Sequence, residues 1–162
     1  MAEAKEAYAK VAKAIREFEP VTMTARPEDV EEAREQCGPD IEIMSLPMDD
    51  SWTRDSGPTF VIDRKGELAG IDWKFNQWGA DYPDIEDDAD FARALLTKNE
   101  IQHFKASFVL EGGSIHVDGD GPLLTTEQCL LHPNRNQELD QEDLELLRRE
   151  FLNVHTIIWL GD

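Results

Sequence analysis

A short polar segment, residues 48–58, gathers carboxylates, a guanidinium and an indole between two apolar runs. Its composition does not fit a strand interior, and Gly57 followed by Pro58 is typical of a turn. The Trp52 indole offers a face for cation–π contact, and the Asp55 carboxylate can accept paired N–H bonds from a planar cation. We therefore predict a site loop for a flat cation. The alternative is a solvated acidic turn with Trp52 folded onto the core.

A second carboxylate stands at the end of an apolar run. Glu111 follows residues 108–110, which have the unbroken apolar character of a buried strand, and it precedes Gly112 and Gly113. Two glycines let the backbone turn sharply or approach a ligand closely. Together with Asp55, Glu111 could hold a guanidinium by complementary hydrogen bonds or share general acid–base work.

A metal site is one alternative use of this region. Its candidate ligands are Glu111, His116, Asp118 and Asp120. Their separations of two and five residues along a strand and turn match neither a calcium loop nor the helical His pair of zinc hydrolases. The spacing therefore predicts no metal.

A cysteine nucleophile is the other alternative. Cys129 could act as a thiolate if His116 served it as a base. The apolar surroundings of Cys129 in the sequence instead favour an unreactive, packed thiol.

Composition limits the partners and the compartment. The chain has 162 residues, and its 16 basic and 35 acidic residues give a formal net charge of −19. This balance argues against nucleic acid or an anionic membrane as partner and is compatible with a cationic ligand. Cys37 and Cys129 are too few and too far apart for a disulfide framework or a zinc site. No secretion signal or membrane-spanning run is visible, so we expect a soluble, cytoplasmic protein.

The elements that position these residues follow from periodicity and breakers. Helical spacing predicts helices over residues 3–18, 27–37, 87–99 and 140–151, the last capped by Asp140 with Asp143 three residues on. Alternation or apolar runs predict strands at 21–25, 41–46, 59–62, 68–75, 108–110, 114–118, 123–126 and 154–160. Helices alternating with strands and short hairpins indicate an α/β fold without an internal linker.

Three side chains within these elements have an expected structural role or an open one. Cys37, at a helix end, reads most simply as a packing residue. Trp73 and Trp78 could belong to the core or line a pocket, and core is expected for at least one of them.

A bulky apolar strand close to the end of the sequence normally leads into another element. We therefore expect the chain to be truncated.

Several long segments resemble a known family. Residues 49–60, 72–79, 110–119 and 124–136 resemble, in the same order, motifs of the agmatine deiminases within the porphyromonad-type peptidylarginine deiminase family. The resemblance covers nearly the whole chain, although the family's opening segment before the first helix appears absent.

The resemblance implies a fold, a reaction and site residues. The expected fold is a pentein-type α/β propeller, five ββαβ modules around a pseudo-fivefold axis, of which residues 1–162 would form about half as a single incomplete domain. The expected reaction is hydrolysis of agmatine to N-carbamoylputrescine and ammonia, as in putrescine biosynthesis, through a cysteine thiolate and without metal or organic cofactor. Asp55 and Glu111 match the carboxylates that grip the guanidinium, and Trp52 matches the wall beside the substrate.

The departures from the family pattern concern catalysis. The family's acid–base His lies in a Gly-His-Ile-Asp type motif that would follow Trp159-Leu160-Gly161-Asp162, and its nucleophile lies in a Gly-Gly-Asn-Ile-His-Cys motif near the C-terminus. Residues 112–117 echo that second motif, but Val117 stands where the nucleophile would be. Neither His116 nor Cys129 matches a catalytic residue.

We therefore expect an N-terminal half with no complete catalytic set in this chain. Such a half would be inactive alone, and it would associate with itself or with a complementary C-terminal half because its sheet edges and apolar faces are left exposed. A non-catalytic module that binds agmatine or a related guanidinium compound, or that only self-associates, and a stand-alone Cys129 hydrolase are the alternative functions.

Overall fold

The computed structural model describes residues 2–80 and 86–161. The chain separates into two compact units, Met1–Met48 and Asp49–Asp162. A single incomplete domain over residues 1–162 stays a prediction.

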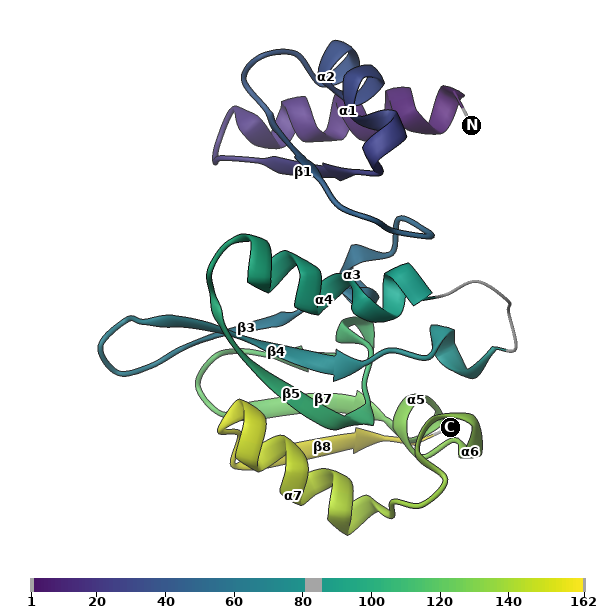
Figure 1. Ribbon diagram of the computed structural model, residues 1–162. Coiled ribbons are helices and arrows are strands. Elements are labelled where there is room, and N and C mark those ends of the chain that lie inside the picture. The colour runs from purple at the N-terminus through teal and green to yellow at the C-terminus, as the bar shows by residue number, and fades with distance from the viewer. Residues whose placement is uncertain (1, 81–85, 162) are drawn as a thin grey trace. The chain divides into compact units, whose positions relative to one another are not determined.

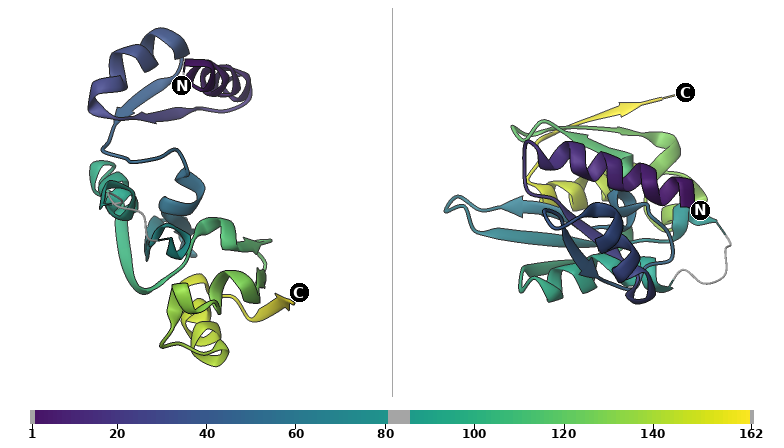
Figure 2. Two further views of the ribbon diagram at one scale, coloured as in Figure 1. Left: turned by 90° about the vertical axis from the view of Figure 1, so that its right-hand side faces the viewer. Right: turned by 90° about the horizontal axis from the view of Figure 1, so that it is seen from above.

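The first unit is a small layer of two helices on two parallel strands. Figures 1 and 2 show both helices on the same face of this sheet. Its core holds Ala9 and Ala12 of the first helix together with Cys37 and Ile41, so Cys37 is the helix-end packing residue that the sequence predicts. The elements are α1 (Ala2–Arg16), β1 (Thr22–Ala25), the 3-10 turn η1 (Pro27–Asp29), α2 (Val30–Cys37) and β2 (Glu42–Ser45).

The second unit contains the same ββαβ arrangement twice. In each copy the first two strands are antiparallel, and the third strand follows a helix and lies parallel to the second. The first copy comprises α3 (Thr53–Ser56), β3 (Thr59–Ile62), β4 (Leu68–Lys74), η2 (Gln77–Gly79), α4 (Glu86–Lys98) and β5 (Gln102–Val109). The second comprises η3 (Gly112–Ser114), β6 (Ile115–Val117), β7 (Pro122–Thr126), α5 (Glu127–Leu130), α6 (Pro133–Asn136), α7 (Gln141–Leu152) and β8 (Thr156–Leu160).

One hydrophobic core joins the two copies. It takes Ile71 and Phe108 from the first and Leu123 and Leu144 from the second. Trp73 lies in this core with its ring 5.3 Å from that of Phe108, and its indole N–H donates to the Thr59 hydroxyl over 2.8 Å. The prediction that at least one of the two tryptophans is a core residue is confirmed.

Helix α7 shows how local signals and packing combine. Asp140 and Asp143 form the reciprocal capping box that their spacing predicts. On the buried side, the Arg148 guanidinium lies 4.5 Å from the Trp159 ring, and its Nε donates to the Leu144 carbonyl over 3.1 Å. Burial lowers the pKa of Arg148 to about 10.

Most predicted elements are present, and the differences have local causes. The segment 48–58 is not a simple turn, because residues 53–56 form the single-turn helix α3, closed where the Gly57 N–H donates to the Thr53 carbonyl. The strand predicted at 108–110 begins earlier, at Gln102, and its first residues are exposed. Helices α5 and α6 have four residues each, too few to produce a readable period.

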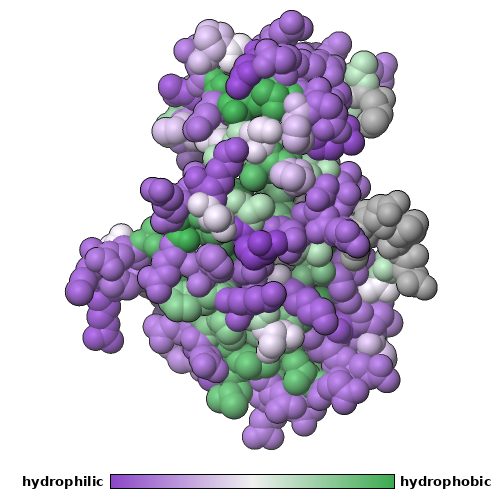
Figure 3. Space-filling model, in the orientation of Figure 1, coloured by the Kyte–Doolittle hydropathy of each residue, from purple (hydrophilic) through white to green (hydrophobic). Residues whose placement is uncertain are grey.

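The face of the molecule displayed in Figure 3 is mainly hydrophilic. Figure 3 shows hydrophobic residues as patches between hydrophilic ones on the displayed face. Among the residues that the structure describes, no helix is long and apolar enough to cross a membrane.

Leu144 and Leu146 give a matched test of the α7 packing. Leu144 is fully buried, whereas Leu146 is 64% exposed on the same helix. We expect Leu144→Ala to lower the free energy of unfolding by about 2–5 kcal/mol because it leaves a cavity, and Leu146→Ala to change it by less than about 0.5 kcal/mol. Urea denaturation measures both; equal losses would contradict the assigned packing.

Asp72 gives a test by pH. It is buried in β4 opposite Lys105 of β5, and burial raises its pKa. The folded state therefore binds more protons than the unfolded state once the pH passes the ordinary Asp pKa of about 3.9, so stability falls as the pH rises from there. Asp72→Asn removes this loss, and we expect it to be more stable than the unmodified chain at pH 7, with the advantage vanishing below about pH 4.

Urea titrations at both pH values measure the difference. Glu67→Gln is the control, since Glu67 is exposed in the β3–β4 turn. An Asp72→Asn variant with no gain at pH 7 would show that the ionised carboxylate is not penalised.

Candidate functional site

The loop that carries the predicted site is anchored by two aspartates that cap each other's segments. The Asp88 carboxylate accepts from the backbone N–H of Asp49 (2.9 Å) and of Asp50 (3.2 Å). In return, Asp49 Oδ2 accepts from the N–H groups of Asp87 and Asp88 at the start of α4, both at 3.1 Å. Burial raises the pKa of Asp88 although these N–H donors favour its ionised form. The pair fixes the first residues of the loop against the start of α4.

Asp55 lies within α3 and reaches the turn that follows Glu111. Its Oδ1 accepts from the Gly113 N–H over 2.7 Å. The approach is so close that a side chain at Gly113 would collide with the Asp55 carboxylate, and one at Gly112 would collide with the Arg54 carbonyl. The two glycines are therefore required for backbone approach, as their position after a buried strand suggests. The structure brings Asp55 and the Glu111 turn together.

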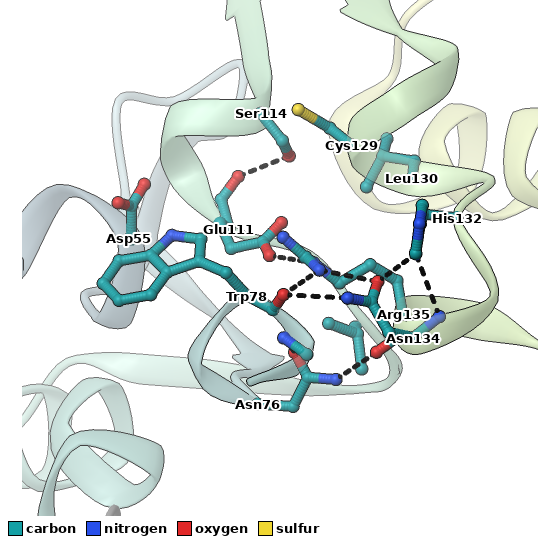
Figure 4. Close-up of polar contacts among 12 residues, drawn as sticks. Asp55, Asn76, Trp78, Glu111, Ser114, Cys129, Leu130, His132, Asn134 and Arg135 are labelled. Atoms are coloured by element: carbon teal, nitrogen blue, oxygen red, sulfur yellow. Dashed lines mark hydrogen bonds and ion pairs between the residues drawn. The ribbon is translucent and has the colours of Figure 1, made fainter. Parts of the chain in front are cut away.

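Glu111 is a buried carboxylate with one partnered and one unpartnered oxygen. Its side chain is 3% exposed, and Oε1 forms an ion pair with the Arg135 Nε (Figure 4). Oε2 is buried and has no hydrogen-bond partner among the described residues. The Ser114 hydroxyl donates to the Glu111 carbonyl over 2.6 Å, which fixes the backbone at this point. Such an arrangement leaves one acceptor for an N–H donor from outside this cluster.

Two indoles meet edge to face beside these acids. The rings of Trp52 and Trp78 lie 5.9 Å apart with an interplanar angle of 88°, and Phe75 contacts Trp78 in the same way at 5.4 Å. Trp52 is 54% exposed, so it is not folded onto the core. Trp78 belongs to the turn η2, which the Asn76 side chain closes by accepting from the Gly79 N–H over 3.1 Å. Exposed aromatic faces of this kind suit a cation with an apolar chain.

Three consecutive residues of α6 tie these parts together. Asn134 and Arg135 both donate to the Trp78 carbonyl, the first over 3.3 Å, and Asn136 exchanges hydrogen bonds with the Val109 backbone at 2.8 and 2.9 Å. The Asn76 amide also donates to the Asn134 carbonyl over 2.8 Å (Figure 4). Helix α6 thus contacts both the Trp78 turn and the end of β5, which lies two residues before Glu111.

The sequence does not single out Arg135 or its two neighbours as site residues, and it leaves Trp78 open between core and pocket. The available signal for Arg135 was a lone cation inside an amide-rich run just after Pro133, a proline typical of a helix start. Its partners Glu111 and Trp78 are 24 and 57 residues away, and only the tertiary structure reveals them.

In the described part of the chain, the residues of the two alternative sites have other contacts. No group of three or more His, Cys, Asp and Glu side chains there could hold a metal ion, and Asp118 instead accepts from the Asp120 N–H within its own turn over 2.9 Å. The half-buried Cys129 packs against the hydrophobic core, and its N–H donates to the Thr126 hydroxyl over 3.2 Å. His116 is exposed on β6.

The chain is similar to agmatine deiminases over nearly its whole length. An agmatine deiminase of Stutzerimonas stutzeri is 49% identical over 165 residues, 98% of this chain and 45% of its own length. The solved agmatine deiminase of Enterococcus faecalis matches with a TM-score of 0.95 at 39% identity, over 99% of this chain and 45% of that one. A variant of the C. jejuni agmatine deiminase with substrate bound matches with a TM-score of 0.89 at 31% identity, over 99% of this chain and 48% of that one.

The match to a protein family extends over the whole sequence. The chain spans about half the length of the relatives that it matches. The model of the Porphyromonas-type peptidyl-arginine deiminases matches residues 1–162. The chain therefore belongs to the Porphyromonas-type peptidyl-arginine deiminase family.

Proposed function

We propose that this chain is the guanidinium-binding half of an agmatine deiminase. In this function Asp55 and Glu111 hold the guanidinium nitrogens of agmatine, and Trp52 forms a wall beside the substrate. The half corresponds to part of a pentein-type propeller, in line with the two ββαβ copies of residues 49–162. Its cellular setting in this proposal is the cytoplasm.

The unpartnered Oε2 of Glu111 carries the proposal. Leaving a buried charged oxygen without a donor costs free energy, and a ligand that supplies an N–H recovers it. A guanidinium suits this oxygen because it stays protonated and offers several N–H donors in one plane. An aliphatic carboxylate or a neutral apolar ligand cannot satisfy an ionised acceptor.

Asp55 and the aromatic pair support the same ligand. Asp55 has one oxygen on the Gly113 N–H, which orients the carboxylate while a second oxygen remains for a cation. The exposed Trp52 and its neighbour Trp78 offer aromatic surface to a positive charge and to an alkyl chain.

The reaction requires a group from outside the proposed binding set. In the family's reaction a cysteine thiolate adds to the guanidinium carbon, ammonia leaves, and water then releases the carbamoyl product from sulfur. A protonated guanidinium is a poor electrophile until fixed charges and N–H bonds position it for attack, and that positioning is the role proposed for Asp55 and Glu111. In residues 112–117, which resemble the family's nucleophile motif, Val117 occupies the position of the cysteine. In this proposal a second polypeptide segment therefore supplies the thiolate.

Binding by the isolated chain is the direct test. We expect calorimetry to detect agmatine binding, and Asp55→Asn or Glu111→Gln to weaken it by about tenfold or more, because a hydrogen bond to a charged group contributes about 1.5–3 kcal/mol. Glu150→Gln is the matched control, since it removes one charge from the exposed side of α7. No heat up to millimolar agmatine, or an equal effect of the control, would refute the proposal.

Activity tests the missing half. We expect no ammonia release from agmatine by the chain alone, and release after addition of a separately expressed C-terminal half of a family member. Asp55→Asn and Glu111→Gln should abolish the restored activity, because positioning of the guanidinium is lost.

Cys129→Ala separates this outcome from a stand-alone hydrolase. It should leave the restored activity unchanged. Activity of the chain alone that disappears in Cys129→Ala would favour the cysteine hydrolase instead. Sedimentation of the chain with and without the added half measures the proposed association; a stable monomer that ignores the added half would contradict it.

A further inference from the structure

We propose that Arg135 is a positioning residue that sets the preference of this site for a guanidinium over an ammonium group. It acts through Glu111 and Trp78, and no contact of its own with the ligand is invoked. The inference rests on the proposed function. It concerns a residue outside the proposed binding set of Trp52, Asp55 and Glu111.

The first argument is the geometry of the Arg135 side chain. Its Nε pairs with Glu111 Oε1, and its Nη1 donates to the Trp78 carbonyl. The guanidinium group is planar and rigid, so its Nε and Nη1 donors lie at a fixed separation and angle. One side chain therefore fixes the Glu111 carboxylate relative to the Trp78 turn. The Arg135 side chain is 11% exposed, which leaves it little freedom to take another position.

The second argument is the backbone of the turn itself. Gln77 and Trp78 both have positive φ angles, 51° and 58°. Two successive side-chain-bearing residues in this region cost free energy, and they persist only when surrounding contacts hold them. The bonds from Arg135 and Asn134 to the Trp78 carbonyl are such contacts. Without them we expect the turn to relax and the Trp78 ring to leave Trp52.

The third argument is that α6 itself is fixed at both ends of this span. Asn136 holds the backbone of Val109, two residues before Glu111, through both the oxygen and the nitrogen of its side-chain amide. Asn134 packs against Gly79, where any side chain would collide with it. Arg135 lies between these anchors and cannot shift without breaking one of them.

The chemical consequence concerns selectivity. With Oε1 held by Arg135, Glu111 presents Oε2 in one direction, and the charge of Arg135 offsets one of the two site carboxylates. A guanidinium needs acceptors in defined directions within its plane, whereas an ammonium is a compact charge that binds any nearby anion. Fixing the carboxylate therefore favours the guanidinium, and freeing it favours neither ligand.

The test compares two ligands of similar length on the full chain. Calorimetry gives the Kd of agmatine and of 1,5-diaminopentane, in which an aminomethyl group, charged as an ammonium, takes the place of the guanidino group. We expect the unmodified chain to prefer agmatine by about tenfold or more, and Arg135→Met and Arg135→Lys to bring the ratio close to one. Lysine keeps the charge but lacks the fork, so it separates geometry from charge. Arg93→Met, which removes a charge from the exposed Arg93–Asp90 pair, should leave the ratio unchanged.

A second measurement does not depend on ligand. The edge-to-face pair of Trp52 and Trp78 should give an exciton signal in circular dichroism, identified by its loss in Trp52→Phe. We expect Arg135→Met to lose this signal while the helical signal remains.

The outcomes separate the two proposals. Arg135→Met with an unchanged ligand ratio, or with an unchanged exciton signal, would overturn the positioning role. Absence of agmatine binding by the unmodified chain would refute the proposed function, and the exciton signal would still decide whether Arg135 holds the turn.

Discussion

The ion pair between Glu111 and Arg135 is the contact on which the other features of the site depend. A carboxylate this buried is stable in its ionised form only with a charged or hydrogen-bonding partner, and Arg135 provides it for one oxygen. After Glu111, Gly113 leaves room for the Asp55 carboxylate. The side-chain amide of Asn136 holds the strand that ends shortly before Glu111. Removing Arg135 would leave these neighbours arranged around an uncompensated carboxylate.

The two ββαβ copies explain where this contact lies. Glu111 stands at the junction where the last strand of the first copy leads into the turn that opens the second. Arg135 belongs to the connection between the second hairpin and its helix. The ion pair therefore joins one copy to the other, beside the core that Phe108 and Leu123 share across the same boundary. The repeated topology thus places the candidate site at the boundary between the two copies.

Much of the fold could be predicted from the sequence because its signals are local. The capping box of Asp140 and Asp143 and the hairpin at residues 63–66 depend on neighbouring residues, and both form. The positions of Asp55 and Glu111 at junctions of strand and loop predict that they lie together. A hydrogen bond from the Gly113 N–H to the Asp55 carboxylate joins Asp55 to the turn after Glu111. Arg135 could not be found in this way, because its role depends on partners far along the chain. The single-turn helix at 53–56 was missed because four residues carry no period.

The adjacency of Asn134, Arg135 and Asn136 constrains how this protein can change over evolutionary time. Each residue binds a different target: the Trp78 turn, the Glu111 carboxylate and the Val109 backbone. A one-residue insertion or deletion within this run would rotate every later side chain by about 100° around the helix axis, so the contacts of all the residues that follow it would be lost together. Length variation in relatives should therefore collect at the reverse turn around Gly119, where a side chain would meet no neighbour, and avoid the tripeptide.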